Sequence, residues 1–292
     1  MPDRERKMKK RSTTVLLILI CLVGAALLLY PTVSDAWNRR HQSHAITGYS
    51  SFVQEMKDDD SEAVLEAAQE YNRGIEPGSI PRMTEERLAE YNAQLDPLGS
   101  GIMGYIEIPA IQCSLPIYHG TAETILTAAV GHIEWSSLPV GGESTHCVIS
   151  GHRGLPSAKL FTHLDELREG DIFVLKVLNE TLVYEVDRIS VVLPDEVSSL
   201  TVMEGEDLCT LVTCTPYGIN THRLLVRGHR VDDSKYGSNV HVTADAAVIK
   251  PLSVFPFAAA PLVLSLVIGL IVYDRQKKKR ERRRKRRENN NL

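Results

Sequence analysis

Two long apolar segments limit what this chain can fold into. Residues 13–30 and residues 254–273 both have about the length that a helix needs to cross a bilayer core, roughly 20 residues with a lower limit near 17. A basic tail lies on the outer side of each segment, with a net charge of +4 over residues 1–11 and +8 over residues 274–292. In a chain of net charge −4, this leaves −16 for the stretch between the tails. The sequence thus predicts an acidic globular region between two basic, membrane-anchored ends.

The charge pattern also predicts an orientation in the cell membrane. Lysine and arginine collect on the cytoplasmic side of membrane spans, so we expect both termini in the cytoplasm and the acidic middle outside the cell. The expected organisation is a cytoplasmic tail at 1–12, a transmembrane anchor at 13–30, an extracellular helical region at 31–103, a β domain at 104–231, a connector at 232–253, a transmembrane helix at 254–273 and a second cytoplasmic tail at 274–292.

Each apolar segment has an alternative interpretation. The first resembles a cleaved signal peptide in that Ser34-Asp35-Ala36 offers a small-x-small cleavage site, but it exceeds the roughly 7–15 apolar residues usual in such peptides, which favours a retained anchor. The second is followed by eleven basic residues, which argues for a membrane stop signal and against a buried core helix. The same placement argues against a nucleic-acid-binding tail.

A helical region precedes the β domain. Apolar residues recur at helical spacing across residues 51–72, with acidic residues between them. This pattern predicts helical structure that breaks at a run of three aspartates, with Ser61 as an N-cap and Gly74 as the stop. Residues 74–83 are rich in glycine and proline, which predicts a loop, and residues 84–92 are expected to form a second short helix.

From Gly104 the sequence changes to short runs of β-forming residues separated by turn residues. The runs are 105–108, 114–118, 147–150, 172–178 and 182–193. Many short strands with few long helices predict a mainly β domain that forms a closed or nearly closed barrel. Two further apolar runs, 210–212 and 224–226, are joined by a loop that contains Pro216 and Gly218, and they read as two more strands.

Three residues at strand ends are candidates for chemistry. Cys214 follows the run 210–212, and Arg223 begins the next strand, where its permanent charge favours the nucleophilic thiolate. His152 lies between glycines directly after the strand 147–150, on a tight turn that can present an imidazole to a groove. The structural alternatives are a small core residue for Cys214 and an ordinary loop residue for His152.

The remaining cysteines and histidines suggest no metal centre. Four of the five cysteines lie outside the first apolar segment, so two disulfides are possible by count. We do not expect them, because the domain is large enough to fold without them and the cysteines lie among apolar strand residues. Their spacing fits no zinc pattern, and we expect neither a metal nor another cofactor.

Four ordered motifs carry a resemblance to a known family. They are YIEIP at 105–109, LPIYHG at 115–120, SGHRG at 150–154 and TLVTCTPYG at 210–218. With them the chain resembles the sortases, and more narrowly class C, the pilin-polymerising sortases of Gram-positive bacteria. The resemblance covers residues 51–231 and extends to the second apolar span. It implies a closed eight-stranded β-barrel and a cysteine transpeptidase that cleaves LPXTG-like sorting signals between Thr and Gly.

The same resemblance implies roles for the three candidates. Cys214 would attack the Thr-Gly carbonyl to form a thioester, His152 would protonate the leaving amine, and Arg223 would hold the substrate carbonyl or the developing oxyanion. A lysine amine of another pilin subunit would resolve the thioester. The partners would be pilins or surface proteins with such signals, and the membrane. The alternatives are a housekeeping sortase that attaches surface proteins to the cell-wall precursor, and a non-catalytic surface receptor on the same barrel.

One segment departs from the family pattern. Class C sortases carry a lid before the barrel, with an Asp-Pro-aromatic motif over the cysteine. At that place this chain has Ile75-Glu76-Pro77-Gly78, which lacks the aromatic ring. Because an aromatic ring supplies most of the apolar contact area of such a motif, we expect any cover formed by residues 74–83 to be weakly held.

Overall fold

The computed structural model describes residues 2–232 and residues 269, 272, 273 and 276. The predicted connector at 232–253, the second transmembrane helix at 254–273 and the basic tail at 274–292 lie outside the described residues, apart from those few positions. The chain divides into two compact units, Met1–Val33 with Val248–Leu292, and Ser34–Ala247.

The first unit contains the beginning of helix α1 (Pro2–Glu55). Most of its large apolar side chains from Val15 to Val33 are exposed, as expected of a surface that meets lipid rather than a protein core. By length and composition, α1 is able to cross a membrane. The anchor at 13–30 stays a prediction.

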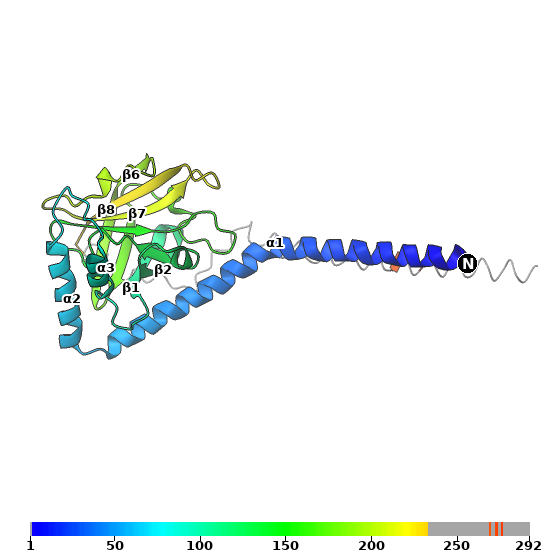
Figure 1. Cartoon of the computed structure of the whole chain (residues 1–292), viewed down its shortest axis with the longest axis horizontal. Helices are drawn as coiled ribbons and strands as arrows, with labels where there is room; N and C mark the ends of the chain where they lie inside the picture. Colours follow the sequence, from blue (N-terminus) through cyan, green and yellow to red (C-terminus); the bar gives the residue numbers. More distant parts are fainter. Residues whose placement is uncertain (1, 233–268, 270–271, 274–275, 277–292) are drawn as a thin grey trace, which may run out of the picture. The chain divides into compact units, whose positions relative to one another are not determined.

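The second unit is built on a closed barrel of eight strands (Figure 1). The strands are β1 (Ile102–Ile108), β2 (Cys113–His119), β3 (Val130–His132), β4 (Thr145–Ser150), β5 (Ile172–Val177), β6 (Glu180–Val192), β7 (Asp207–Thr215) and β8 (His222–Arg230). Around the barrel their order is β1-β2-β3-β4-β7-β8-β6-β5. The predicted closed β-barrel is confirmed.

Two of the eight strand pairs are parallel, β2 with β3 and β4 with β7, and the others are antiparallel. The core is filled by inward-facing side chains, among which Phe173 and Tyr184 stack at 5.5 Å between ring centroids. Gly228 on β8 leaves room for this stack, because a Cβ atom there would lie 2.7 Å from the Phe173 ring. Most of the buried apolar residues form one cluster, and Val148, Leu200, Val212 and Leu225 form a second, smaller one.

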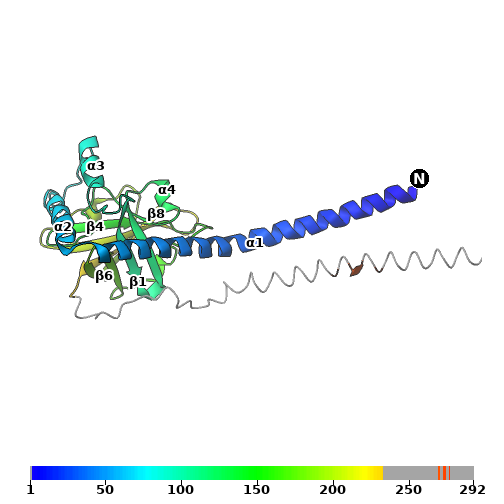
Figure 2. The ribbon, with the colours of Figure 1, turned by 90° about the horizontal axis from the view of Figure 1, so that it is seen from below.

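The second half of α1 lies across the barrel beside β1 (Figure 2). Tyr49 fixes it there, since its hydroxyl donates to the Met103 carbonyl at 3.0 Å and accepts the Leu178 N–H at 2.8 Å. Nearer the start of this half, Gln42 donates to the Ala128 carbonyl at 2.7 Å. These bonds dock the helix on the barrel independently of its apolar beginning.

Three further helices and three 3₁₀ turns complete the unit. They are α2 (Asp58–Arg73), α3 (Glu85–Asn92), α4 (Glu123–Leu126), and turns at Pro109–Ile111, Leu164–Glu166 and Ser198–Leu200. Thr84 caps α3 through its side chain, which accepts the Arg87 N–H, and Gly74 ends α2 as predicted. Tyr91 of α3 is fully buried, and its hydroxyl lies 3.0 Å from His132 Nδ1.

The predicted N-cap at Ser61 is wrong. The helix break falls at Met56 and Lys57, so the N-cap is Lys57, four residues earlier than predicted, and α2 begins at Asp58. Three aspartates then occupy its first turn, where negative charge is favoured by the helix dipole. Ser61 instead points inward, is buried, and accepts a long 3.4 Å bond from Asn179.

Candidate active site

Two neighbouring parallel strands, β4 and β7, end side by side at one rim of the barrel. Just past β4, the Gly151 N–H donates to the Val212 carbonyl at 3.0 Å. The Thr213 hydroxyl donates to the Gly151 carbonyl at 2.7 Å. His152 follows Gly151 just past the end of β4, and Cys214 follows Thr213 near the end of β7, so the two predicted catalytic residues come from neighbouring segments at this rim.

Arg223, the third predicted residue, faces Cys214 across the pair β7–β8. Side chains directly opposite each other in an antiparallel pair have Cβ atoms about 4.5–5.5 Å apart. The Arg223 Nη1 donates to the backbone carbonyls of Asn220 at 3.3 Å and His222 at 3.2 Å, both just before or at the start of β8. The strand register thus sets Arg223 directly across the sheet from Cys214.

Exposure separates Cys214 from the other barrel cysteines. Cys214 is half-buried, whereas Cys113, Cys147 and Cys209 are buried, and all five cysteines of the chain are free thiols. Burial raises the pKa of Cys113 to about 12 and raises that of Cys209 well above its ordinary value, because a thiolate loses its hydration in the core. The core alternative for Cys214 therefore does not hold.

His152 begins a loop that is closed by a hydrogen bond from the Phe161 N–H to the His152 carbonyl at 3.1 Å. Only glycine fits before it, because a Cβ atom at Gly151 would lie 2.6 Å from the Phe161 ring. The imidazole is half-buried, and its Nε2 lies 3.4 Å from Oε2 of Glu123, at the beginning of α4. Sequence reasoning did not find this carboxylate, because α4 was not predicted.

Arg153, which follows His152, is a second residue that sequence reasoning missed. Its side chain is 9% exposed. Nη1 donates to Thr215 Oγ1 at 3.2 Å, Nη2 pairs with the Asp165 carboxylate, and the guanidinium lies 6.0 Å from the centre of the Tyr217 ring. Arg153 therefore connects the turn after β4 to the residues that follow Cys214. The SGHRG motif contained this arginine, but nothing in its spacing distinguished it from a solvated loop residue.

The histidines left unassigned in the sequence lie elsewhere. His119 bonds the Gln94 carbonyl at 2.7 Å, and the fully buried His132 bonds the Ser137 carbonyl at 2.8 Å, so both support the packing around α3. His222 bonds the neighbouring Thr221 hydroxyl. Among the residues that the structure describes, no group of three His, Cys, Asp or Glu side chains is placed to hold a metal ion.

The segment 74–83 is held near the opposite end of β7. Ile75 is buried in the core, and the Gly78 N–H donates to the Val202 carbonyl at 2.9 Å. Val202 follows Thr201, whose carbonyl is hydrogen-bonded to the ring of His146 on β4. His146 in turn pairs with Leu208, near the start of β7. Cys214 lies six residues further along β7, about 20 Å away at 3.3 Å per residue. These contacts keep the anchored part of the segment away from the thiol.

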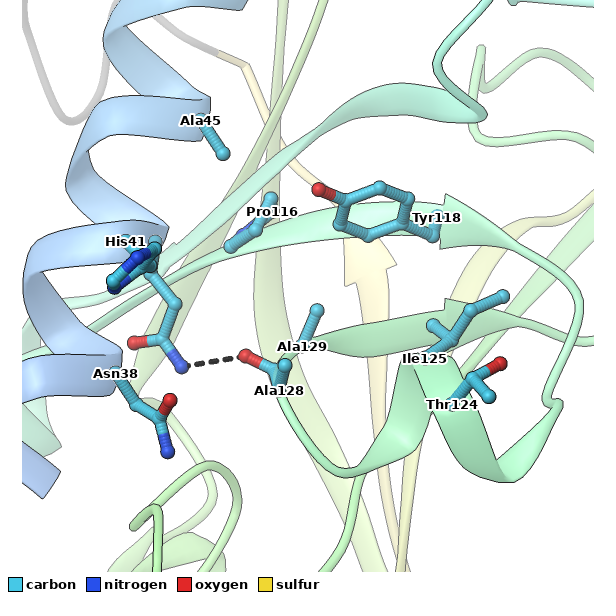
Figure 3. Close-up of a pocket in the computed structure, with 10 residues that line it drawn as sticks. Asn38, His41, Ala45, Pro116, Tyr118, Thr124, Ile125, Ala128 and Ala129 are labelled. Atoms are coloured by element: carbon cyan, nitrogen blue, oxygen red, sulfur yellow. Dashed lines mark hydrogen bonds between the residues drawn. The ribbon is translucent and has the colours of Figure 1, made fainter. Parts of the chain in front are cut away.

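A pocket of about 250 Å³ lies between α1, β2 and α4 (Figure 3). Its walls are mostly apolar, with Tyr118, Ile125 and Ala129 on the barrel side, and the Gln42–Ala128 hydrogen bond closes one end. None of Cys214, His152 and Arg223 lines it. The predicted catalytic residues therefore lie on the rim outside this pocket.

Comparisons of the sequence and of the structure with known proteins both find sortases. The family described as "Sortase domain" matches residues 106–231. The chain is 32% identical to sortase D of Bacillus subtilis (strain 168) over 146 residues, which are 49% of this chain and 71% of that protein. The crystal structure of sortase C1 from Streptococcus agalactiae is 49% identical, with a TM-score of 0.63, and the match covers 65% of this chain and 98% of that one. Sortase C of Streptococcus pneumoniae is 43% identical, with a TM-score of 0.58, covering 65% and 97%.

Proposed function

The chain belongs to the sortase family of cysteine transpeptidases, and from this premise we propose that it is a membrane-anchored class C sortase that joins pilin subunits. The observation that carries the proposal is the strand register that sets Cys214 opposite Arg223, with His152 at the end of the adjacent parallel strand. Sortase C1 of S. agalactiae and sortase C of S. pneumoniae are among its solved neighbours, and the S. pneumoniae structure is described in terms of pilin substrate specificity.

In the proposed first half-reaction, the Cys214 thiolate attacks the threonine carbonyl of an LPXTG-like sorting signal. Negative charge collects on the carbonyl oxygen, where the guanidinium of Arg223 stabilises it by a charge-assisted hydrogen bond. When the tetrahedral species collapses, the Thr–Gly bond breaks and the protonated imidazole of His152 gives its proton to the leaving amine. The products are a thioester at Cys214 and a free amino terminus on glycine.

In the proposed second half-reaction, a lysine amine of another pilin subunit attacks the thioester carbonyl. His152, now neutral, accepts the proton that the amine loses, and Cys214 leaves as a thiolate. One amide bond forms for the one that was broken, so the exchange needs no oxidant, reductant or nucleotide. Arg223 is proposed to stabilise the oxyanion in both half-reactions, because a tetrahedral species with a negatively charged oxygen forms in each.

The proposal also includes the orientation of the chain. The catalytic domain lies outside the cell and both termini lie in the cytoplasm, with the apolar beginning of α1 as the first membrane anchor and residues 254–273 as the second. An extracellular barrel meets secreted proteins that carry sorting signals, which are the substrates that the proposed chemistry requires.

The test is a reaction of the purified full chain with a panel of sorting-signal peptides. Each peptide is offered with either a pilin-type lysine peptide or a cell-wall bridge peptide as the acceptor amine, and products are identified by mass spectrometry. We expect cleavage between Thr and Gly, a thioester on Cys214, and transfer to the lysine side chain. Transfer only to the bridge amine would favour a housekeeping sortase. Failure to form a thioester with any peptide would contradict the proposal and favour a non-catalytic receptor.

A further inference from the structure

A buried arginine links the two chain segments that carry the reacting groups. We propose that Arg153 is a positioning residue for transpeptidation, which holds the turn bearing His152 against the segment that follows Cys214. The inference rests on the proposed function, because it takes Cys214 and His152 to be the groups that react. It assigns to Arg153 no contact with the substrate.

The contacts join neighbours of the two catalytic residues directly. Arg153 follows His152, Thr215 follows Cys214, and the Arg153 Nη1 donates to Thr215 Oγ1 at 3.2 Å. The backbone bonds between β4 and β7 reach only as far as Gly151, so beyond the strand ends this side-chain bond continues the connection. A misplacement of about 1 Å between reacting groups can cost roughly a hundredfold in rate, so such a connection matters for chemistry.

The second arm of the same guanidinium fixes the arginine itself. Nη2 pairs with Asp165, just inside the 3₁₀ turn Leu164–Glu166, so the positive charge is already compensated. Because its charge is compensated, Arg153 is poorly suited to stabilise an oxyanion as Arg223 is proposed to do. Its two bonded nitrogens instead suit it to hold two chain segments together. Tyr217 covers the guanidinium, and Gly154 permits this, because a Cβ atom at Gly154 would lie 3.1 Å from the Tyr217 ring.

The site requires arginine rather than any cation. A planar guanidinium reaches two acceptors in fixed directions, whereas a lysine ammonium is a single point on a flexible stem. In addition, the Nε of Arg153 is buried and has no hydrogen-bond partner among the described residues. An unpaired buried donor costs stability, so Arg153 is not what a barrel optimised for stability alone would place here. Both observations point to a geometric role in the reaction.

Three substitutions test the inference. Arg153→Met keeps the length of the side chain and removes both arms, Arg153→Lys keeps the charge, and Thr215→Val removes one acceptor while keeping the shape. Arg227→Met is the matched control, because Arg227 makes bonds of 3.0 and 2.7 Å to Asp187 and is 17% exposed, yet lies on β8 away from the rim.

We expect kcat for sorting-peptide cleavage to fall at least about thirtyfold in Arg153→Met, with KM within about threefold of the parent. Arg153→Lys restores part of the loss, and Thr215→Val lowers kcat about three- to tenfold. The variant that combines Arg153→Met with Thr215→Val has the same kcat as Arg153→Met alone, because both changes break the same hydrogen bond. Arg227→Met lowers Tm but leaves kcat within about twofold.

Two results overturn the inference: a folded Arg153→Met variant with the kcat of the parent, or a loss of kcat that Arg227→Met reproduces at an equal loss of Tm. If Arg153→Met does not fold, Thr215→Val tests the inference instead. An unchanged kcat in Thr215→Val would show that the Arg153–Thr215 hydrogen bond does not matter for the reaction. An inactive parent chain would instead refute the proposed function. An active parent with unaffected variants refutes only the role of Arg153.

Discussion

Among the barrel cysteines, Cys214 is set apart by exposure more than by any neighbouring charge. Cys113, Cys147 and Cys209 point into the core, where a thiolate would have neither water nor a substrate near it. Cys214 sits at the end of β7, where the barrel wall stops. In the proposed assignment, Cys214 is the nucleophile because it lies where its strand ends and a substrate can reach the thiol.

Replacing Cys214 with alanine is expected to abolish peptide cleavage and to leave the fold intact. The change removes one half-exposed atom at a strand end, so Tm should stay within a few degrees of the parent. Cys113→Ala is the control, because it removes a buried thiol and should lower Tm while keeping turnover. Cleavage is followed by chromatography of the peptide products, and measurable turnover by Cys214→Ala would contradict the assignment.

His146 is expected to make the stability of the barrel depend on pH. Its ring bonds the Thr201 carbonyl at 2.9 Å and the Thr210 hydroxyl at 2.7 Å, and burial lowers its pKa from 6.5 to about 4. The unfolded chain therefore takes up a proton at a higher pH than the folded chain does. Stability that is fully present above about pH 6.5 is lost as the pH falls toward 4, a loss on the order of 3 kcal/mol.

This loss is measurable by urea unfolding at pH 7 and at pH 4.5. In the His146→Gln variant, which cannot take up the proton, the difference between the two pH values should shrink. His222→Gln, at the start of β8, is the matched control and should retain the pH dependence of the parent. An equal loss of stability in His146→Gln and in the parent would show that another group is responsible.

At the scale of elements, the segment 74–83 is expected to influence the thiol only weakly. Its bond to Val202 and the burial of Ile75 anchor it about 20 Å along β7 from Cys214. Replacing residues 76–81 with glycine and serine, or Glu76 with alanine, should change the rate at which Cys214 reacts with a small thiol reagent less than about tenfold. An increase of a hundredfold or more, equivalent to roughly 2.7 kcal/mol, would reveal a strongly closed cover.

The longer strands were predictable because their runs of β-forming apolar residues correspond to the side chains that are buried in the barrel. The runs at 105–108, 172–178 and 182–193 became β1, β5 and β6, with boundaries that differ by at most three residues. β3 was missed because three residues are too few for a periodic pattern, and its place is set by its pairing with β2 and β4. The four-residue helix α4 was missed for the same reason.

The candidate site was predictable only as far as its motifs reached. Cys214, His152 and Arg223 stand at recognisable points in ordered motifs, and the strand register sets Cys214 and Arg223 opposite each other. Glu123 and Arg153 acquire their places through tertiary contacts over 29 and 62 residues, which no local pattern encodes. Strand propensity and residue spacing predict where strands end. Which strand ends lie next to each other depends on tertiary packing.

At the scale of the whole molecule, we expect both tails to lie in the cytoplasm. The basic runs at 1–11 and 274–292 lie outside the two apolar segments, and positive charge resists transfer across the membrane. Protease added to intact cells or protoplasts should digest the acidic middle and spare epitope tags fused to either end. Detergent-permeabilised cells are the control, in which the tags should also be lost. A tag digested in intact cells would refute this orientation.

The parallel pairing of β4 with β7 has a consequence for how the enzyme is made. The Thr213 hydroxyl bonds the Gly151 carbonyl although the two residues are 62 apart in the chain, with the β5–β6 hairpin between them. A nascent chain emerges N-terminus first, so the histidine appears long before the thiol, and Arg223 later still. No truncated product that ends before β8 contains all three residues. With the proposed site, the chain can act as a transpeptidase only after its last strand, β8, has closed the barrel.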